Sequence, residues 1–459
     1  MYEIREDLVM KNKIMLFGAG VVGKEAYENL SKKHCLVGFI DNNSALVGKK
    51  IFGLPIILPQ ELSKYFLPDI SIIITSIHYI AIAKQLESMG ISDFLVYLDG
   101  VLYKKHKKGN EIKRCKRCIM DDSSDDTILF DNVGYCNYCN SAINNKGKLY
   151  FPNKMGEKKL KDLLKKVKQA GNNKKYDCVM GLSGGLDSSY LAYLGYKWRL
   201  KVLVIHLDDG FDTEISKSNI KKIIDATGFD YEVIKPDKEQ YNDLILSYMK
   251  AGVPNIAVPQ DNIVLAYIYK KMEEYNILYF FSGGNYALEC ILQKGNTYSN
   301  LDVDNIRNIY KKFGTKSIDK IELISSEQVK RAKEQQGIEE FRPLNYVEYN
   351  RKRAFQELKN FCGFEYYGGK HLENTLTAFI QLYWFTKRFG VDKRTSHLSS
   401  LIVSNQLTRE EALKEASEAL CDQKEMDKYI SIIKDNLKIS DDEFIRIMSA
   451  PIHQHEEYR

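Results

Sequence analysis

Short apolar runs alternate with amphipathic stretches along the first hundred residues. Apolar residues dominate 13–17, 35–40, 71–75 and 94–98, and each run has the length of one buried strand. Stretches 21–31 and 79–89 instead repeat apolar residues at helical spacing. This order predicts a small Rossmann-like α/β domain over residues 1–103.

The same alternation returns in the second half of the chain. Apolar runs at 176–182, 201–207, 231–234 and 277–281 are separated by helical stretches such as 216–226. Strands that alternate with helices form parallel sheets with crossover connections. We therefore predict a doubly wound parallel sheet domain over residues 151–390.

A helical region is predicted to follow over residues 391–459. Thr408 and Glu411 are typical of a capping box at a helix start. The polar residues 449–459 are expected to fray.

Polar clusters follow three of the predicted strands in the second half. They are Ser183–Ser188, residues 206–210 and residues 282–285. Ligands of open α/β sheets bind beyond the carboxyl ends of the strands, so the three clusters are expected to form one site.

The first cluster, Ser183-Gly184-Gly185-Leu186-Asp187-Ser188, has the composition of a phosphate cradle. Glycines let backbone N–H groups crowd around an anion, and the start of the next helix adds partial positive charge. The spacing is not that of a Walker A loop, because no Gly-Lys-Ser/Thr closes it. It resembles the SGGxDS loop of PP-loop (HUP-like) ATP pyrophosphatases, which split ATP into AMP and pyrophosphate. A glycine turn without chemistry is the alternative.

A second glycine motif stands in the N-terminal domain. Gly18, Gly20 and Gly23 follow the first predicted strand, and Asp41 ends the second, the order of a dinucleotide-binding fingerprint. Residues 13–53 are also similar to the N-terminal domain of bacterial sugar acetyltransferases, which implies a nucleotide or nucleotide-sugar ligand. A docking module with an empty cleft is the alternative.

Four of the nine cysteines form two Cys-x2-Cys pairs, after a basic, glycine-containing linker. Seventeen residues separate the pair Cys115 and Cys118 from the pair Cys136 and Cys139, a separation typical of a structural zinc site with four thiolate ligands. An iron–sulfur cluster is the competing interpretation. We predict that the linker and the cysteine module together occupy residues 104–150.

Composition changes this picture little. The 459 residues predict two to four domains, and no apolar stretch has the length of a membrane helix. Without a signal-peptide pattern we expect a cytoplasmic protein without a membrane partner. Eleven lysines lie between residues 146 and 175, a candidate RNA-binding face or the solvated side of an amphipathic helix. Leu160, Leu163 and Val167 at helical spacing favour the helix, so nucleic acid is not the favoured partner.

From about residue 114 to about 413 the chain resembles the N-acetyl sugar amidotransferases, PP-loop enzymes of bacterial surface-polysaccharide and flagellin-sugar biosynthesis. The resemblance is carried by the cysteine pairs, the three polar clusters, residues 366–373 and residues 392–400. It implies conversion of an acetamido group of a sugar, which we expect to be nucleotide-linked, into an acetamidino group, with ATP and ammonia. The N-terminal domain is an addition to this layout.

The resemblance and the chemistry of the residues together assign roles. Asp187, Lys370 and Arg394 are the catalytic candidates, with Asp187 also a candidate for Mg²⁺. His371 and His397 are candidates for proton transfer, and Glu373 is a candidate for the same site. The ATP-binding candidates are Ser183, Gly184, Gly185, Asp187, Ser188, His206, Asp208, Asp209, Gly283 and Asn285.

Ammonia is expected from a partner glutaminase subunit. Residue 2 is Tyr rather than the Cys of one glutaminase class, and Cys178, Cys290, Cys362 and Cys421 lack the nucleophile turn of the other. The alternative function is a tRNA-modifying PP-loop enzyme, a thiolase, for which only Cys178 and Cys290 are available in the sheet region. A non-catalytic nucleotide-binding scaffold is the third interpretation.

Overall fold

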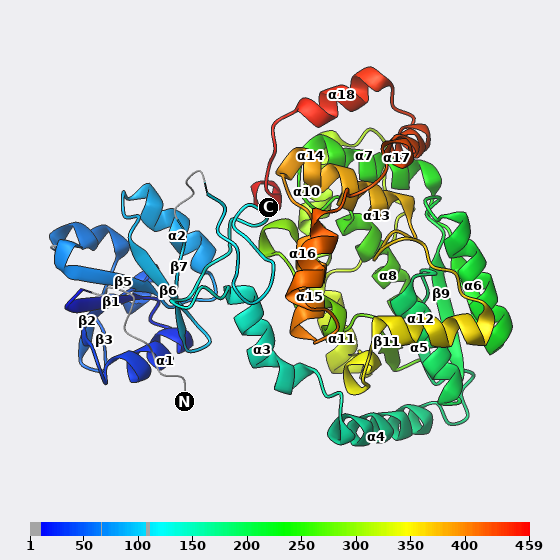
Figure 1. Cartoon of the computed structure of the whole chain (residues 1–459), viewed down its shortest axis with the longest axis horizontal. Helices are drawn as coiled ribbons and strands as arrows, with labels where there is room; N and C mark the ends of the chain where they lie inside the picture. Colours follow the sequence, from blue (N-terminus) through cyan, green and yellow to red (C-terminus); the bar gives the residue numbers. More distant parts are fainter. Residues whose placement is uncertain (1–10, 66, 107–110) are drawn as a thin grey trace. The chain divides into compact units, whose positions relative to one another are not determined.

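The computed structural model describes residues 11–65, 67–106 and 111–459. It divides the chain into two compact units, residues 1–144 and 145–459. Residues 1–10 of the predicted first domain and 107–110 of the predicted linker lie outside the described residues. Figure 1 shows both units with the labels used below.

The first unit contains a seven-stranded sheet in the order β3-β4-β2-β1-β5-β6-β7. The strands β1, β2, β4, β5 and β6 run parallel, whereas β3 and β7 pair antiparallel to their neighbours at the two edges. The helices α1 and α2 follow β1 and β5. The bounds are β1 Lys13–Phe17, α1 Val21–Leu30, β2 Cys35–Ile40, β3 Lys50–Ile51, β4 Leu54–Ile57, β5 Ile70–Ile74, α2 Tyr79–Ser88, β6 Phe94–Leu98 and β7 Val101–Lys104.

Alternating side chains of the central strands fill two separate cores. Ile14 and Leu16 pack with Ala26 and Leu30 of α1, while Met15 packs on the opposite face. Successive residues of a strand point to opposite faces, so a strand of continuous apolar residues is buried on both sides. The predicted Rossmann-like sheet is confirmed.

The second unit contains a five-stranded, all-parallel sheet in the order β10-β9-β8-β11-β12. The strands are β8 Cys178–Gly181, β9 Val202–Leu207, β10 Asp230–Ile234, β11 Tyr279–Phe281 and β12 Glu339–Phe341. The chain runs outward from β8 to β10 and then returns to β11 on the other side of β8. The strand order therefore reverses between β8 and β11, where open α/β sheets bind ligands.

Helices surround this sheet, as the alternating pattern predicts. They include α4 Lys154–Ala170, α5 Leu186–Lys197, α6 Glu214–Thr227, α7 Lys238–Ala251, α8 Val258–Glu274, α9 Tyr286–Glu289, α10 Val303–Phe313, α11 Ser326–Gln336 and α12 Arg351–Cys362. Ile268 and Met272 of α8 pack on one sheet face against Val179 and Leu203. A further helix, α3 (Asn137–Leu149), spans the boundary between the units.

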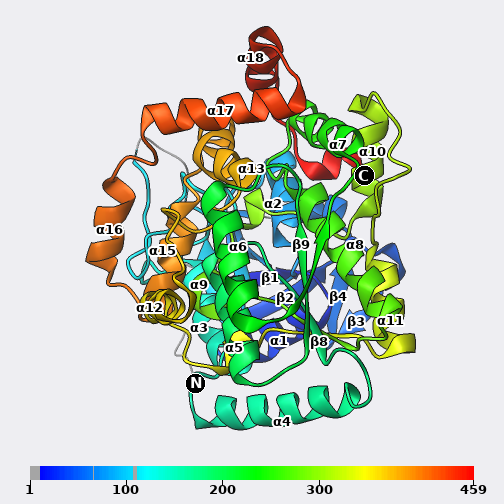
Figure 2. The same ribbon diagram turned by 90° about the vertical axis from the view of Figure 1, so that its right-hand side faces the viewer.

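The C-terminal region is helical. It comprises α13 Thr375–Phe379, a π-helical turn Ile380–Trp384, α14 Phe385–Phe389, α15 Arg394–Val403, α16 Arg409–Ser417, α17 Gln423–Leu437 and α18 Asp441–Ser449. Figure 2 shows α17 beside α7 and α13, and the predicted capping box of Thr408 and Glu411 opens α16.

The prediction that residues 449–459 fray is wrong. His455 and Tyr458 are 3% and 6% exposed, and the Tyr458 hydroxyl donates to the Ala251 carbonyl (3.0 Å). Asn305 of α10 in turn donates to the His455 carbonyl (2.7 Å). Two aromatic rings buried against α7 and α10 hold the polar chain end in place.

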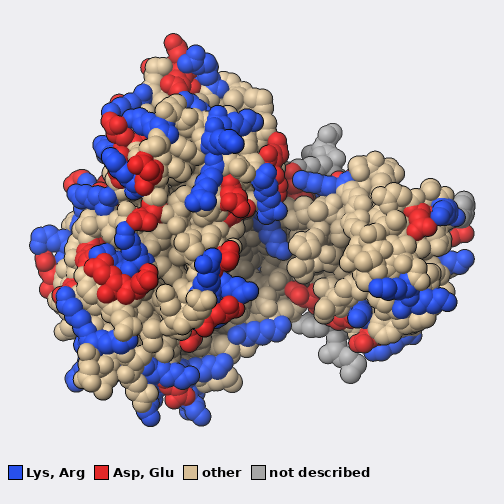
Figure 3. Space-filling model, turned by 180° about the vertical axis from the view of Figure 1, so that it is seen from behind, with Lys and Arg blue, Asp and Glu red and all other residues tan. Residues whose placement is uncertain are grey.

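The lysine-rich helix α4 has the amphipathic form that the sequence favours. Leu160, Leu163 and Val167 are buried, and the lysines lie on the other side. On the face shown in Figure 3, Lys and Arg side chains of the larger unit are interspersed with Asp and Glu. No helix among the described residues is long and apolar enough to cross a membrane.

Candidate functional site

The loop between β8 and α5 has the backbone form of an anion cradle. Gly184 has φ +76°, and a Cβ there would lie 2.6 Å from the Ser216 carbonyl oxygen. The Ser183 N–H donates to Ser188 Oγ (3.2 Å), which draws the loop around the first turn of α5. Gly184 is therefore required by the close approach of α6 and by the left-handed turn.

The cluster after β11 lies against this loop. A Cβ on Gly283 would be 3.2 Å from the Ser188 backbone nitrogen, so the two segments touch at the point where the strand order reverses. Asn285 caps α9, because its Oδ1 accepts from the Leu288 N–H (2.9 Å), and it is 2% exposed. Gly283 thus borders the cradle, while the Asn285 side chain serves the local turn.

The cluster after β9 joins the loop from the other side. His206 Nδ1 contacts the Leu182 carbonyl oxygen and Nε2 contacts Asp212 Oδ2, both at 2.9 Å. Burial works against the charged imidazole, but Asp212 outweighs it and raises the pKa of His206. Asp208 pairs with Lys235 (3.1 Å).

Asp209 is a structural carboxylate in this arrangement. Its two oxygens accept from the Phe211 N–H, Tyr241, Gln260 and Asn374, at 2.6 to 3.2 Å. It is 5% exposed, and burial raises its pKa. With four donors in place, its oxygens are committed to holding the loop after β9.

Lys370 lies between two carboxylates beside the loop. Its Nζ is 3.2 Å from Asp187 Oδ2 and 2.9 Å from Glu289 Oε1, and the Tyr349 hydroxyl donates to Asp187 Oδ1. Burial favours the neutral amine, yet the two carboxylates outweigh it and raise the pKa of Lys370. The ammonium is charged and fixes the Asp187 side chain at the start of α5.

Glu373 is buried against the loop from the same segment of chain. Ser183 Oγ donates to its Oε1 (3.2 Å), and the carboxylate is 7% exposed. Burial raises the pKa of Glu373 to about 7, and the charge of Asp187 acts in the same direction.

A pocket of about 250 Å³ opens beside Asp187 and Lys370. Tyr366, Tyr367 and leucines of α15 form much of its wall, with His397 and Arg351 as polar groups. The His371 and His397 rings are 5.8 Å apart, and burial together with the Lys370 charge lowers the pKa of both, to about 4 for His371. Both imidazoles are therefore neutral at neutral pH.

Arg394 also lines this pocket, but its guanidinium is engaged elsewhere. Its nitrogens donate to Asp392 and to the carbonyls of Glu415, Ala416 and Glu418 at the end of α16. These contacts use every N–H donor of the guanidinium and connect the end of α16 to the start of α15. The structure does not bring these donors to the loop.

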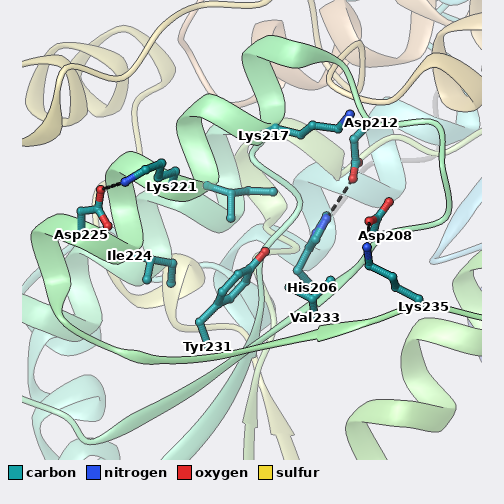
Figure 4. Close-up of a pocket in the computed structure, with 11 residues that line it drawn as sticks. His206, Asp208, Asp212, Lys217, Lys221, Ile224, Asp225, Tyr231, Val233 and Lys235 are labelled. Atoms are coloured by element: carbon teal, nitrogen blue, oxygen red, sulfur yellow. Dashed lines mark hydrogen bonds and ion pairs between the residues drawn. The ribbon is translucent and has the colours of Figure 1, made fainter.

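A second pocket, of about 400 Å³, opens between α6 and β10. Figure 4 shows His206 and Tyr231 along one wall, with Lys217 and Lys221 on α6 opposite. Its rim includes Asp208 and Lys235, and Ser216, next to Lys217, donates to the Ser183 carbonyl (3.2 Å). This pocket therefore lies next to the loop and shares no lining residue with the pocket beside Lys370.

Several residues of the site were not singled out in the sequence. Tyr349 and Tyr367 contact Asp187 and Leu186 of the loop from more than 100 residues away along the chain, and Glu289 contacts Lys370 beside the loop. The sequence could have indicated Glu289 and Tyr367, because both lie within or next to recognised clusters. Tyr349 belongs to no motif. The same holds for Asp212, which lies beyond the cluster at 206–210.

The four cysteines of the first unit come together as predicted. Their Sγ atoms are buried and all lie within 4.8 Å of one another, with Cys118 and Cys136 at 3.5 Å and Cys115 and Cys139 at 3.7 Å. Zn–S bonds of about 2.3 Å in a tetrahedron put sulfurs about 3.8 Å apart, so the set fits one zinc ion. With four protein ligands, no position is open for catalysis.

The glycine motif of the first unit packs tightly. A Cβ on Gly18 would be 2.5 Å from the Thr75 carbonyl oxygen, and one on Gly23 would be 1.9 Å from that of Gly18. Gly20 faces open space. Asp41 Oδ2 accepts from the Ala19 N–H (2.8 Å), so its carboxylate is bonded to the glycine loop itself.

Family models match both ends of the chain. Residues 373–459 match the C-terminal domain of WbpG-like LPS biosynthesis proteins, and residues 10–96 match the C2185-like N-terminal domain. Neither match spans half of the chain, so each describes its own segment. No curated protein matches the sequence.

Solved structures with some similarity include two synthetases. The NMN synthetase from Francisella tularensis is 12% identical, with a TM-score of 0.27, and the match covers 65% of this chain and 98% of that chain. The NH3-dependent NAD synthetase from Campylobacter jejuni subsp. jejuni is 13% identical with a TM-score of 0.26 and the same coverage. TM-scores this low carry no argument about fold or function.

Proposed function

We propose that the chain is an ATP-dependent amidotransferase of bacterial surface-polysaccharide biosynthesis. It converts the acetamido group of an N-acetyl sugar into an acetamidino group and releases AMP and pyrophosphate. The match of residues 373–459 to a domain of LPS biosynthesis proteins supports the pathway class. The reaction is inferred from the site and from the resemblance of its motifs.

The observation that carries the proposal is that the loop Ser183–Ser188 adjoins two pockets that share no residue. The larger pocket, beside His206 and Tyr231, suits the nucleoside of ATP. The smaller pocket, beside Asp187 and Lys370, suits an acceptor of about monosaccharide size. The phosphates then lie over the cradle, where the two substrates meet.

An amide needs activation because its carbon is a poor electrophile and its oxygen a poor leaving group. The amide oxygen attacks the α-phosphorus of ATP, the bond from that phosphorus to the bridging oxygen of pyrophosphate breaks, and an O-adenylyl imidate that keeps the proton on its nitrogen forms. Ammonia then attacks the imidate carbon. AMP leaves with the former amide oxygen and one proton, and the amidinium remains.

The chain's own groups have defined tasks in this scheme. Backbone N–H groups of the loop and the start of α5 stabilise the departing pyrophosphate. Lys370 holds Asp187 in position and offsets negative charge between the substrates. Mg²⁺, when bound, neutralises the phosphates, and oxygens of Asp187 and of its surroundings are the type of ligand it takes.

The first unit has supporting tasks. Zinc at Cys115, Cys118, Cys136 and Cys139 stabilises the module next to the sheet of β1 to β7. Gly20 and the adjoining loop bind a nucleotide or nucleotide sugar. Ammonia comes from a glutaminase partner.

The thiolase alternative is less well supported. Burial raises the pKa of the Cys178 thiol well above its usual range and that of Cys290 to about 11. A sulfur-transferring cysteine acts as a thiolate, which both environments disfavour.

The test is a reaction of the purified chain with ATP, Mg²⁺, ammonium and a panel of free and nucleotide-linked N-acetyl sugars. We expect AMP, pyrophosphate and a sugar lighter by about one mass unit, because NH replaces O. Asp187→Asn is expected to abolish all three, and the exposed Asp304→Asn serves as the matched control. No AMP release with any sugar would contradict the proposal, and AMP formation with tRNA in place of a sugar would favour the thiolase.

A further inference from the structure

One carboxylate oxygen at the loop has no partner. Oε2 of Glu373 is buried and makes no hydrogen bond to any residue that the structure describes, whereas Oε1 accepts from Ser183 Oγ. The side chain as a whole is 7% exposed. A buried carboxylate is costly unless it is paired, so this oxygen is suited to a ligand from outside the chain.

The position of this oxygen is set by the backbone. The Glu373 carbonyl accepts from both the N–H and Oγ1 of Thr213, each at 3.1 Å, and the Thr375 N–H donates to the Phe211 carbonyl (2.7 Å). A Cβ on Gly185 would lie 2.4 Å from Glu373 Oε1. The carboxylate is thus held in contact with the cradle at the start of α5.

Because Glu373 contacts Ser183 and lies against Gly185 of the loop, a polyphosphate bound in the cradle would come close to this carboxylate. Two anions repel strongly where water is excluded. Lys370 relieves only part of this repulsion, because its ammonium is already paired with Asp187 and Glu289, and no salt bridge reaches Glu373 among the described residues.

A divalent cation between carboxylate and phosphate removes this conflict. Mg²⁺ is typically bound by one or two carboxylates together with substrate phosphates. Asp187 offers less than the sequence suggests, because one of its oxygens accepts from Tyr349 and the other from Lys370. Glu373 keeps one oxygen free.

We propose that Glu373 Oε2 is a direct ligand of the divalent cation that accompanies ATP at the loop Ser183–Ser188. The inference rests on the proposed function only in that it takes ATP as the ligand of the cradle. It adds a metal ligand from the start of the C-terminal domain, about 190 residues away from the loop in sequence.

The test measures binding rather than turnover. An ATP analogue with a methylene group between the α- and β-phosphorus is titrated calorimetrically into the full chain, with Mg²⁺ and with EDTA. We expect Mg²⁺ to strengthen binding at least tenfold in the natural chain and not in Glu373→Gln. In EDTA, Glu373→Gln should bind as tightly as the natural chain or more tightly, because the repelling charge is gone. Glu334→Gln, on the exposed helix α11, is the matched control.

Electron paramagnetic resonance of Mn²⁺ with the same analogue gives the second readout. The spectrum of the ternary complex should be lost in Glu373→Gln. If Glu373→Gln unfolds at a lower temperature than the natural chain, Glu373→Asp is used instead. This variant keeps the charge on a shorter side chain and should alter the spectrum.

The outcomes are distinguishable. Full Mg²⁺ enhancement in Glu373→Gln, or an unchanged Mn²⁺ spectrum in Glu373→Asp, overturns the inference and leaves the proposed function standing. Loss of the enhancement in Asp187→Asn alone also overturns it, in favour of Asp187. If the natural chain binds no analogue under either condition, the proposed function fails together with the inference.

Discussion

Replacement of Lys370 by Met probes the charge arrangement beside the loop. The Lys370 side chain is 13% exposed, and its partners Asp187 and Glu289 are 19% and 24% exposed. Met has a similar length and no charge. The variant therefore leaves two mostly buried carboxylates without their shared cation.

The magnitude follows from this geometry. Removing one partner of a buried ion pair costs about 3–5 kcal/mol, and the residual exposure of the carboxylates puts the Lys370→Met variant near 3 kcal/mol. With an unfolding entropy of about 2.1 cal/mol/K per residue, 1 kcal/mol corresponds to roughly 1.5 °C in Tm for the unit of residues 145–459, so a decrease of about 4–5 °C is expected at pH 7.5.

The pH dependence has a definite sign. Burial favours the neutral form of Glu289, but Lys370 outweighs it and lowers the pKa to about 2. A lowered folded-state pKa stabilises the protein above the unfolded value near 4.5, and the contribution is lost as the pH falls toward 2. In Lys370→Met the cation is gone and burial raises the pKa of Glu289 instead. Protonation then favours the folded variant, so its Tm deficit should narrow between pH 7.5 and pH 5.

Thermal melting of the full chain measures both effects. Lys222→Met is the matched control, because its partner Glu365 is 60% exposed and such pairs contribute about 1 kcal/mol or less. Adding Glu289→Gln to Lys370→Met should recover part of the stability. A Lys370→Met variant that melts within 2 °C of the natural chain at pH 7.5, or whose deficit grows at pH 5, would refute the reasoning.

Three further predictions concern other parts of the molecule. Gly184→Ala places a Cβ 2.6 Å from the Ser216 carbonyl oxygen and should weaken ATP binding, measured by calorimetry, at least tenfold. A Cβ on Gly228 would have no atom within 4 Å, so Gly228→Ala should leave ATP binding unchanged. Cys118→Ser should lower the metal content, measured by plasma mass spectrometry, from one zinc per chain, and iron in the natural chain would contradict the zinc assignment. Tyr458→Ala should destabilise the larger unit by about 3 kcal/mol in urea, because the ring is 6% exposed, and an unchanged midpoint would restore the expectation of a frayed end.

The sheets were predictable because their central strands are buried on both faces. In a chain that alternates strand and helix, continuous apolar runs such as 35–40 and 201–207 indicate buried strands. The structure has β2 and β9 at these positions. The edge strand β12 was missed because Glu339 and Glu340 are exposed and carry no strand pattern. Short edge strands are placed by pairing with a neighbour, which a local pattern does not encode.

In the site, only the residues that belong to sequence motifs could be predicted. Glycines of the loop are demanded by local backbone geometry, so Gly184 stands out in the sequence. Tyr349 contacts Asp187 from 162 residues away, and no spacing indicates such a pair. Arg394 has the chemistry of a phosphate ligand, but the end of α16 supplies carbonyls that take its donors. The contacts of Tyr349 and Arg394 both depend on groups that the fold brings together and that are distant in the sequence.

The central claim is that ATP activates the oxygen of a sugar amide. It is tested most directly with an acetamido sugar that supports AMP release, labelled with ¹⁸O at the amide carbonyl, in the presence of ammonium. The account predicts that the label leaves with AMP, which becomes two mass units heavier, while pyrophosphate stays unlabelled and the sugar gains nitrogen. Unlabelled AMP, or a sugar that retains ¹⁸O, would contradict it.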